Sequence, residues 1–191
     1  MKNNKENKMS RLIITLTIIG VISALALSFV YQWTQPYIEE NRRRAREEAV
    51  FSVLPGIDDY RTLEKEELTF YEGLDKKGEP VGVAVLRSGP GFEGEPVEIM
   101  VGTDPKTGRI YSIRILEHSE TPGLGARITE EEFLQHFREM PFGNYSVVHR
   151  PPETKTEVQS ITGATISSEV VTEIVTKAVA DIENIYGGGK K

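Results

Sequence analysis

One long uncharged run limits what this chain can fold into. The run covers twenty residues, 12–31, with the sequence LIITLTIIGVISALALSFVY. Twenty residues at helical rise span about 30 Å, which is the thickness of the hydrocarbon core of a bilayer. The run therefore predicts one transmembrane helix, over residues 12–33, because Trp33 is of a type that favours the membrane interface.

The charges beside this run predict its orientation. Residues 1–11 form a basic tip with four basic side chains and one acidic side chain. Since Lys and Arg are enriched on the cytoplasmic side, we expect a cytoplasmic N-terminus and a single-pass protein. A cleaved signal peptide is the alternative, because Ala24-Leu25-Ala26 fits a cleavage pattern. The run is longer than the apolar region of such peptides, which favours an uncleaved anchor, and both interpretations put the rest of the chain outside the cytoplasm.

Composition excludes several functions. After residue 11 the chain has 19 basic and 28 acidic side chains, whereas nucleic-acid binding needs clustered Lys and Arg, so no nucleic acid is expected as a partner. The chain has no cysteine, which excludes disulfides, a cysteine nucleophile and a cysteine-ligated cluster made by this chain alone. The histidines, His118, His136 and His149, lack the spacing of metal ligands, so no metal site is expected.

The remaining pattern predicts an α+β domain with a mostly antiparallel sheet and helices packed on it. Residues 34–60 are expected to form a stalk helix and a linker, because apolar residues recur on one helical face before Pro55-Gly56. Strands are predicted at residues 68–71, 81–86, 97–101, 110–116 and 145–149, with residues 97–116 forming a hairpin.

Two helices are predicted in the second half of the chain. The first covers residues 130–140, with Thr129 as N-cap, Glu132 in a capping box, and Phe133 and Phe137 buried. The second, over residues 166–186, is the clearer one. Its apolar stripe consists of Val171, Ile174, Val175, Ala178, Ile182 and Ile185. The folded domain is thus expected over residues 61–186, followed by a flexible tail over residues 187–191.

A hydroxyl-rich segment directly precedes the last predicted helix. Residues 160–168 have the sequence SITGATISS. Free backbone N–H groups and the helix dipole favour a phosphate at such a helix start, and Gly163 permits close approach. The hydroxyls of Thr162, Thr165 and Ser167 could donate to a phosphate or carry one. Ordinary helix capping is the alternative, and from these residues alone it is the commoner arrangement.

A second segment, HSETPGLGAR at residues 118–127, follows the predicted hairpin. Its Pro-Gly-Leu-Gly sequence predicts a constrained turn that exposes Leu124. Such a turn could hold Leu124 and Thr121 against a flat ligand, and the alternative is a simple connecting loop. A further Gly-rich loop, GPGFEG, covers residues 89–94.

Taken together, these segments resemble the FMN-binding G subunit of the Rnf ion-translocating electron-transport complex. They also resemble the related C subunit of the sodium-pumping NADH:quinone reductase. The resemblance includes the single span, the stalk, the GPGFEG loop and the hairpin, and the chain length favours the Rnf protein. One position departs from the attachment motif, since Gln159 stands where the family usually has aspartate.

This resemblance implies covalent FMN, joined by a phosphoester to Thr165 through a flavin transferase. Thr162, Gly163 and Ala164 would shape the phosphate site, and Glu120, Thr121, Pro122, Gly123 and Leu124 would border the flavin. Leu124 is the candidate for one face of the ring, with Phe92 or Tyr111 for the other.

The resemblance also implies a place in a larger assembly. The chain would be an electron-transfer subunit of the bacterial inner membrane, held by membrane lipid and by the other subunits of an ion-translocating ferredoxin:NAD oxidoreductase. It would have no complete active site of its own, and it would not be the NADH site, because it shows no unit in which a GxGxxG sequence joins a strand to a helix. Two alternatives stay open: the quinone-reductase C subunit, and an anchored extracytoplasmic binding or scaffold module without a redox role.

Overall fold

The computed structural model describes residues 2–65, 68–92 and 94–187, and it divides the chain into two compact units, Met1–Arg44 and Ala45–Lys191. Residues 188–191 of the expected tail over residues 187–191, and Glu93 of the Gly-rich loop, therefore lie outside the described residues.

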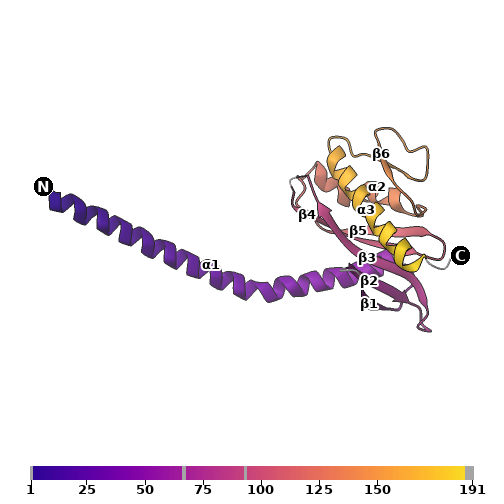
Figure 1. Ribbon diagram of the computed structural model, residues 1–191, viewed down its shortest axis with the longest axis horizontal. Helices are drawn as coiled ribbons and strands as arrows, with labels where there is room; N and C mark the ends of the chain where they lie inside the picture. The colour runs from indigo at the N-terminus through magenta and orange to yellow at the C-terminus, as the bar shows by residue number, and fades with distance from the viewer. Residues whose placement is uncertain (1, 66–67, 93, 188–191) are drawn as a thin grey trace. The chain divides into compact units, whose positions relative to one another are not determined.

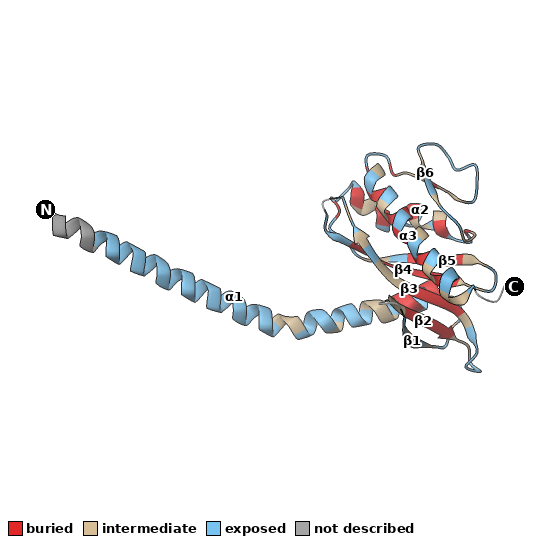
Figure 2. Cartoon of the chain, in the orientation of Figure 1, coloured by how far each residue is buried: buried red, intermediate tan, exposed pale blue. Residues whose placement is uncertain are grey.

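The first unit consists of most of helix α1 (Lys2–Val53). The expected span and the expected stalk helix are parts of this one helix, which contains Pro36. It includes a stretch that is long and apolar enough to cross a membrane, and none of that stretch is buried. Figure 2 shows the exposure along this part of α1. A helix whose apolar side chains are exposed all round is suited to a lipid environment.

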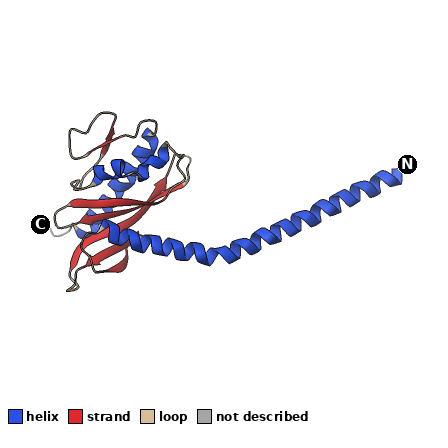
Figure 3. Cartoon of the chain, turned by 180° about the vertical axis from the view of Figure 1, so that it is seen from behind, coloured by secondary structure: helices blue, strands red, loops and turns tan. Residues whose placement is uncertain are grey.

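The second unit is built on a five-stranded antiparallel sheet in which consecutive strands are neighbours (Figure 3). The strands are β1 (Asp59–Lys65), β2 (Leu68–Leu74), β3 (Pro80–Pro90), β4 (Pro96–Asp104) and β5 (Arg109–Glu117). Four of them contain the predicted strands, and β4 and β5 form the predicted hairpin. Strand β1 was not predicted, because it is a charged edge strand with little burial on either face.

Helices cover both faces of this sheet. Helix α3 (Thr165–Tyr186) packs on one face, shown in yellow in Figure 1, and its predicted stripe is buried there except for the partly buried Ile185. The last turns of α1, with Ala49, Val50 and Val53, pack on the other face against Tyr71 and Met100. The end of the predicted stalk is thus part of the core of the folded unit.

The predicted helix over residues 130–140 is wrong in extent. The segment forms two short pieces, α2 (Glu131–Leu134) and η2 (Gln135–Phe137), and a further short helix, η1 (Gly125–Thr129), precedes it. The backbone of Ile110 exchanges hydrogen bonds with Glu139 and Met140, which draws these two residues out of a helix. Phe133 and Phe137 are buried as predicted.

The predicted capping box at this helix is also wrong. The N-cap is Glu130, without a side-chain cap, and the Thr129 hydroxyl donates to the Ala126 carbonyl instead.

A small parallel pair completes the fold. Strand β6 (Ser146–Val148) lies within the predicted strand at residues 145–149, and it pairs with β7 (Glu157–Gln159), which was not predicted. Gln159 ends β7, so the sheet pair leads the chain directly into the SITGATISS segment and α3.

Candidate functional site at the start of helix α3

The chain enters α3 through a turn that needs glycine. Gly163 has φ of +81°, a left-handed conformation that side chains with a Cβ rarely adopt. The buried Ala164 is the N-cap residue, and it provides no side-chain cap. The Ser168 hydroxyl holds the turn from inside, because it accepts from the Ile161 amide at 3.0 Å and donates to the Ala164 carbonyl at 2.9 Å.

The start of α3 therefore keeps free donors. The amides of Thr165, Ile166 and Ser167 are in the first turn, where no carbonyl one turn earlier is available to them. The alternative interpretation, in which a threonine or serine side chain caps this helix, is not what the structure shows. Together with the helix dipole, these amides make the position favourable for a phosphate.

The candidate hydroxyls differ in availability. Thr165 is half-buried, and its hydroxyl makes no hydrogen bond to any residue that the structure describes. Thr162 is exposed. Ser167 is buried, and its hydroxyl donates to the Glu120 carboxylate at 2.5 Å. Thr165 thus combines a free hydroxyl with the free amides of the helix start.

The SETPGLG segment lies against this turn. It follows β5, and its backbone is folded by bonds from the Leu124 and Ala126 amides to the Thr121 carbonyl, at 3.2 and 3.1 Å. A Cβ at Gly163 would lie 3.3 Å from Leu124 Cδ2, so the two motifs touch. Thr121, Pro122 and Gly123 are exposed on the outer side of the turn.

The Gly-rich loop joins the same place through Glu120. This side chain is only 8% exposed, and its carboxylate accepts from the Phe92 amide at 2.9 Å as well as from Ser167. Three segments that are far apart in the sequence therefore meet around Glu120. Glu120 itself is an interior residue and does not offer its carboxylate to the surface.

Exposed hydrophobic side chains gather at this meeting point. Outside α1, the large exposed hydrophobic residues of the described chain are Phe92, Leu124 and Ile166, at 56%, 49% and 50% exposure. Each comes from one of the three segments that meet at Glu120. Such a group of exposed apolar side chains on an otherwise acidic, polar domain marks a surface for a ligand or a partner.

Ile166 was missed by the sequence reasoning. The residue is next to Thr165, but it is exposed and lies off the buried stripe of α3. An isoleucine on the polar side of an amphipathic helix was the signal that could have identified it.

Tyr111, a candidate for the second face of a flavin, is not brought to this site. It packs with the cluster formed by the end of α1, on the face of the sheet opposite to α3, and its hydroxyl donates to the Val81 carbonyl at 3.3 Å. Phe92, the other candidate, is at the site.

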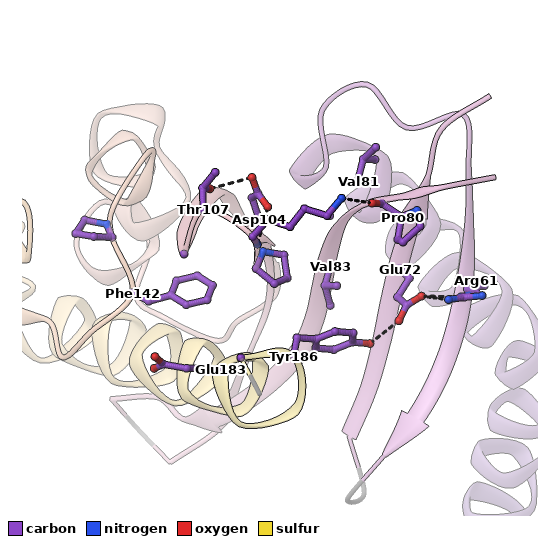
Figure 4. A pocket seen from close by; sticks show the side chains of 16 residues that line it. Arg61, Glu72, Pro80, Val81, Val83, Asp104, Thr107, Phe142, Glu183 and Tyr186 are labelled. Carbon is purple, nitrogen blue, oxygen red and sulfur yellow. Dashed lines mark hydrogen bonds and ion pairs between the residues drawn. The ribbon is translucent and has the colours of Figure 1, made fainter. Parts of the chain in front are cut away.

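A pocket lies at the other end of α3. Its volume is about 650 Å³, and it is lined by residues that include Arg61, Glu72, Phe142 and Tyr186 (Figure 4). Glu72 is buried, and it accepts from Arg61 Nε at 2.6 Å and from the Tyr186 hydroxyl at 2.9 Å. Burial and the bond to Glu72 raise the pKa of Tyr186. None of the residues around Thr165 lines this pocket.

The histidines have local partners. His118 accepts from the Glu120 amide, His136 bonds with the Phe133 carbonyl, and His149 bonds with the Ser160 hydroxyl. Among the described residues, no group of three or more Asp, Glu or His side chains is arranged to hold a metal ion.

Comparison with known proteins identifies the family of this chain. Residues 91–180 match the FMN-binding domain family, and that range contains Phe92, the SETPGLG segment and the start of α3. The chain is 30% identical over 187 residues to the G subunit of the ion-translocating oxidoreductase complex of Methanosarcina acetivorans, with 94% of this chain and 96% of the relative covered. It is 26% identical to the G subunit of the proton-translocating ferredoxin:NAD(+) oxidoreductase complex of Clostridium ljungdahlii, with 98% of each covered.

Solved structures agree on the fold. NqrC of Shewanella oneidensis has a TM-score of 0.53 at 17% identity, over 70% of this chain and 71% of that one. The C subunit of the Na(+)-translocating NADH-quinone reductase of Parabacteroides distasonis has a TM-score of 0.51 at 24% identity, over 60% of each chain. The protein is thus one with an FMN-binding domain on an apolar N-terminal helix. It belongs to the family of the G subunits of ion-translocating oxidoreductase (Rnf) complexes, and the two relatives named above match it over nearly their whole length.

Proposed function

We propose that this chain carries FMN covalently on Thr165 and relays electrons within an ion-translocating oxidoreductase complex. The observation that carries the proposal is the coincidence, at one place, of a free hydroxyl, free helix amides and three exposed hydrophobic side chains. A phosphate with an attached flat ring needs each of these features.

The residues present fit the phosphate of FMN. In the phosphoester, the FMN phosphoryl group replaces the hydrogen of the Thr165 hydroxyl, so that one negative charge remains on the phosphate. The first amides of α3 can donate to it, and the helix dipole stabilises such a charge by about 0.3–1 kcal/mol. Thr162 and Gly163 are exposed beside this position, and Gly163 leaves room for close approach.

The residues present also fit the flavin ring. Leu124 and Ile166 are on neighbouring segments at the start of α3, and Phe92 is tied to them through Glu120. Their exposed apolar surface can cover part of the ring and exclude water from it, while Thr121, Pro122 and Gly123 border its edge. The flavin supplies the electron-transfer chemistry when it is bound, and the protein holds and orients it.

The site is an open surface, which suits a relay. The described residues form a small depression here, lined by residues that include Phe92, Glu120 and Thr121. A flavin held there keeps part of its ring accessible to redox partners in other subunits. Because electrons must come from and go to those subunits, the chain needs no complete active site of its own.

The apolar helix suggests how the domain is held. We propose that residues 12–33 span the bacterial inner membrane with the N-terminus in the cytoplasm, because the basic side chains precede the span. The FMN-binding domain is then extracytoplasmic, where covalent attachment prevents loss of the cofactor. A flavin transferase on that side would complete the protein, and membrane lipid and other proteins of the complex would surround it.

The test compares Thr165→Val with Thr154→Val, which changes an exposed threonine outside the site. Both full-length proteins are produced with a flavin transferase, denatured, and examined by in-gel flavin fluorescence and intact mass. We expect FMN minus water to be added to the wild type and to Thr154→Val, and no addition to Thr165→Val. Covalent flavin in Thr165→Val contradicts the attachment site, and a colourless wild type of unmodified mass favours the scaffold interpretation.

A further inference from the structure

We propose that Glu120 is a positioning residue whose buried carboxylate holds the three hydrophobic side chains in place around Thr165. The functional part of this inference rests on the proposed function, because the side chains that Glu120 positions are those that we assign to the flavin. Its structural part is independent of any cofactor.

The carboxylate connects segments that have no sequence proximity. Oε1 accepts from the Phe92 amide at 2.9 Å, and Oε2 accepts from the Ser167 hydroxyl at 2.5 Å. Glu120 itself is in the SETPGLG segment, four residues before Leu124. One side chain thus fixes the Gly-rich loop and the SETPGLG segment to the first turn of α3, and each of these segments carries one exposed hydrophobic side chain.

The surroundings of the carboxylate leave space for nothing larger than glycine. A Cβ at Gly91 would lie 2.7 Å from Glu120 Oε1, and a Cβ at Gly125 would lie 2.7 Å from Ser167 Oγ and in collision with Glu120 Oε2. Real Cβ contacts do not reach these distances. Backbone from two segments is therefore packed directly against the carboxylate, which makes the connection rigid.

The two donors, the Phe92 amide and the Ser167 hydroxyl, explain why a glutamate suits position 120. The Phe92 amide can only donate, and a carboxylate offers one acceptor oxygen to it and a second to Ser167. Glutamine keeps this geometry, because its oxygen can accept from Phe92 while its NH₂ donates to Ser167 Oγ. Alanine loses both bonds and leaves the Phe92 amide without its partner, so the two substitutions separate position from charge.

The structural part is tested on the full-length chain without flavin, by amide hydrogen exchange measured with NMR. In Glu120→Ala we expect exchange at the Phe92 amide to accelerate about tenfold, as for the loss of one buried hydrogen bond. The Ile161 amide, which is held by Ser168, is the internal reference and should not change. Glu120→Gln should retain slow exchange at Phe92, and Ser167→Ala should free the start of α3 while Phe92 stays protected.

Glu72→Ala is the matched control. Glu72 is 6% exposed, and like Glu120 it accepts on both carboxylate oxygens, from the Arg61 guanidinium and from the Tyr186 hydroxyl, but it lies at the pocket at the other end of α3. Glu72→Ala should lower stability at least as much as Glu120→Ala, because it also removes an ion pair, and it should leave exchange at Phe92 unchanged. Unchanged exchange in Glu120→Ala, or equal acceleration in Glu72→Ala, would overturn the proposed connection.

The functional part is read from the flavinylated proteins by visible circular dichroism of the flavin. Glu120→Ala should reduce the flavin signal per bound FMN at least about twofold, because the ring loses its fixed neighbours, whereas Glu120→Gln and Glu72→Ala should keep the wild-type signal. A loss in Glu120→Gln equal to that in Glu120→Ala would show an effect of charge and overturn positioning. If wild type binds no FMN while the exchange results hold, the proposed function fails and the connection stands.

Discussion

Single residues decide the geometry of the turn before α3. Gly163 has a left-handed backbone that disfavours a side chain, and an added Cβ would in addition press lightly against the end of the Leu124 side chain. The residue that follows the turn, Ala164, leaves the helix start uncapped, and three positions further on Ser167 uses its hydroxyl elsewhere. Thr165 thereby keeps its hydroxyl free of hydrogen bonds to the described residues, directly in the first turn of α3.

Gly163→Ala is expected to destabilise the domain by about 1–2 kcal/mol, the cost of a left-handed conformation for a residue with a Cβ. The measurement is urea denaturation of the full-length protein. The added Cβ would lie 3.3 Å from Leu124 Cδ2, so the Leu124 side chain should shift and its exposure should change. Stability equal to the wild type would mean that the turn does not hold this backbone conformation in solution.

Gln159→Asp concerns recognition by the transferase. Gln159 is half-buried at the end of β7, six residues before Thr165, at the position where the family's attachment motif usually has aspartate. We expect the substitution to preserve or increase the fraction of protein that carries flavin, measured by the ratio of flavin absorbance to protein. A marked decrease would show that this position is not read as part of the attachment motif.

At the scale of elements, α3 has two chemically different ends. Its N-terminus offers free amides beside Thr165, and its C-terminus carries Tyr186, which donates to the buried Glu72. Because the two ends share no residues with each other's surroundings, changes at one end serve as controls for the other. The middle of the helix buries its apolar stripe against the sheet and keeps the ends apart.

Tyr186→Phe should change the response of stability to alkaline pH. Burial, and then the bond to Glu72, raise the pKa of Tyr186 above its value of about 10 in the unfolded chain. The stabilising contribution of the neutral phenol is therefore complete below pH 10, and it is lost as the pH rises toward the folded-state pKa.

The phenylalanine variant should lose about 1 kcal/mol at neutral pH and show a smaller further loss above pH 10. The free energy of unfolding is measured by urea denaturation between pH 7 and about 11, with the exposed Tyr37→Phe as control. An unchanged slope above pH 10 in Tyr186→Phe would contradict the assignment of this titration to Tyr186.

At the scale of the molecule, the boundary between the units lies inside α1. The folded unit begins at Ala45, and the last turns of α1 supply Ala49, Val50 and Val53 to the core. The part of α1 before this boundary has its apolar side chains exposed along its length. One continuous helix can thus have exposed apolar side chains in one part and buried ones in another, because the burial of each turn depends on what packs against that turn.

Two truncations test this boundary. Removal of residues 1–44 should leave a folded domain that no longer floats with lipid vesicles, whereas the full-length chain should float. Removal of residues 1–53 should unfold or aggregate the domain, because each buried valine contributes about 1.5–3 kcal/mol. Circular dichroism and flotation measure both outcomes, and equal stability of the two truncations would contradict the inclusion of the end of α1 in the core.

Much of this molecule follows from local patterns. The apolar run, the strands β2 to β5 and the stripe of α3 are each visible in the sequence, because the pattern of apolar residues in each segment reflects whether its sides face lipid, the protein core or water. Strand β1 is not visible in this way, because an edge strand of charged residues gains its structure from pairing with β2. The helix over residues 130–140 was overestimated for a related reason, since bonds to Ile110 outweigh local helix propensity.

The site likewise has features that local patterns predict and features that depend on contacts between distant segments. The order of the residues predicts a hydroxyl-rich motif before a long amphipathic helix, and the family resemblance indicates Thr165 and Leu124. The folded chain adds that Phe92 and Ile166 lie near Leu124, that Tyr111 lies on the other face of the sheet, and that the Glu120 carboxylate is buried between segments. The periodicity of hydrophobic residues reflects which side of each segment is buried, and it can be seen within that segment. Contacts between segments that are distant in the sequence depend on how the whole chain packs.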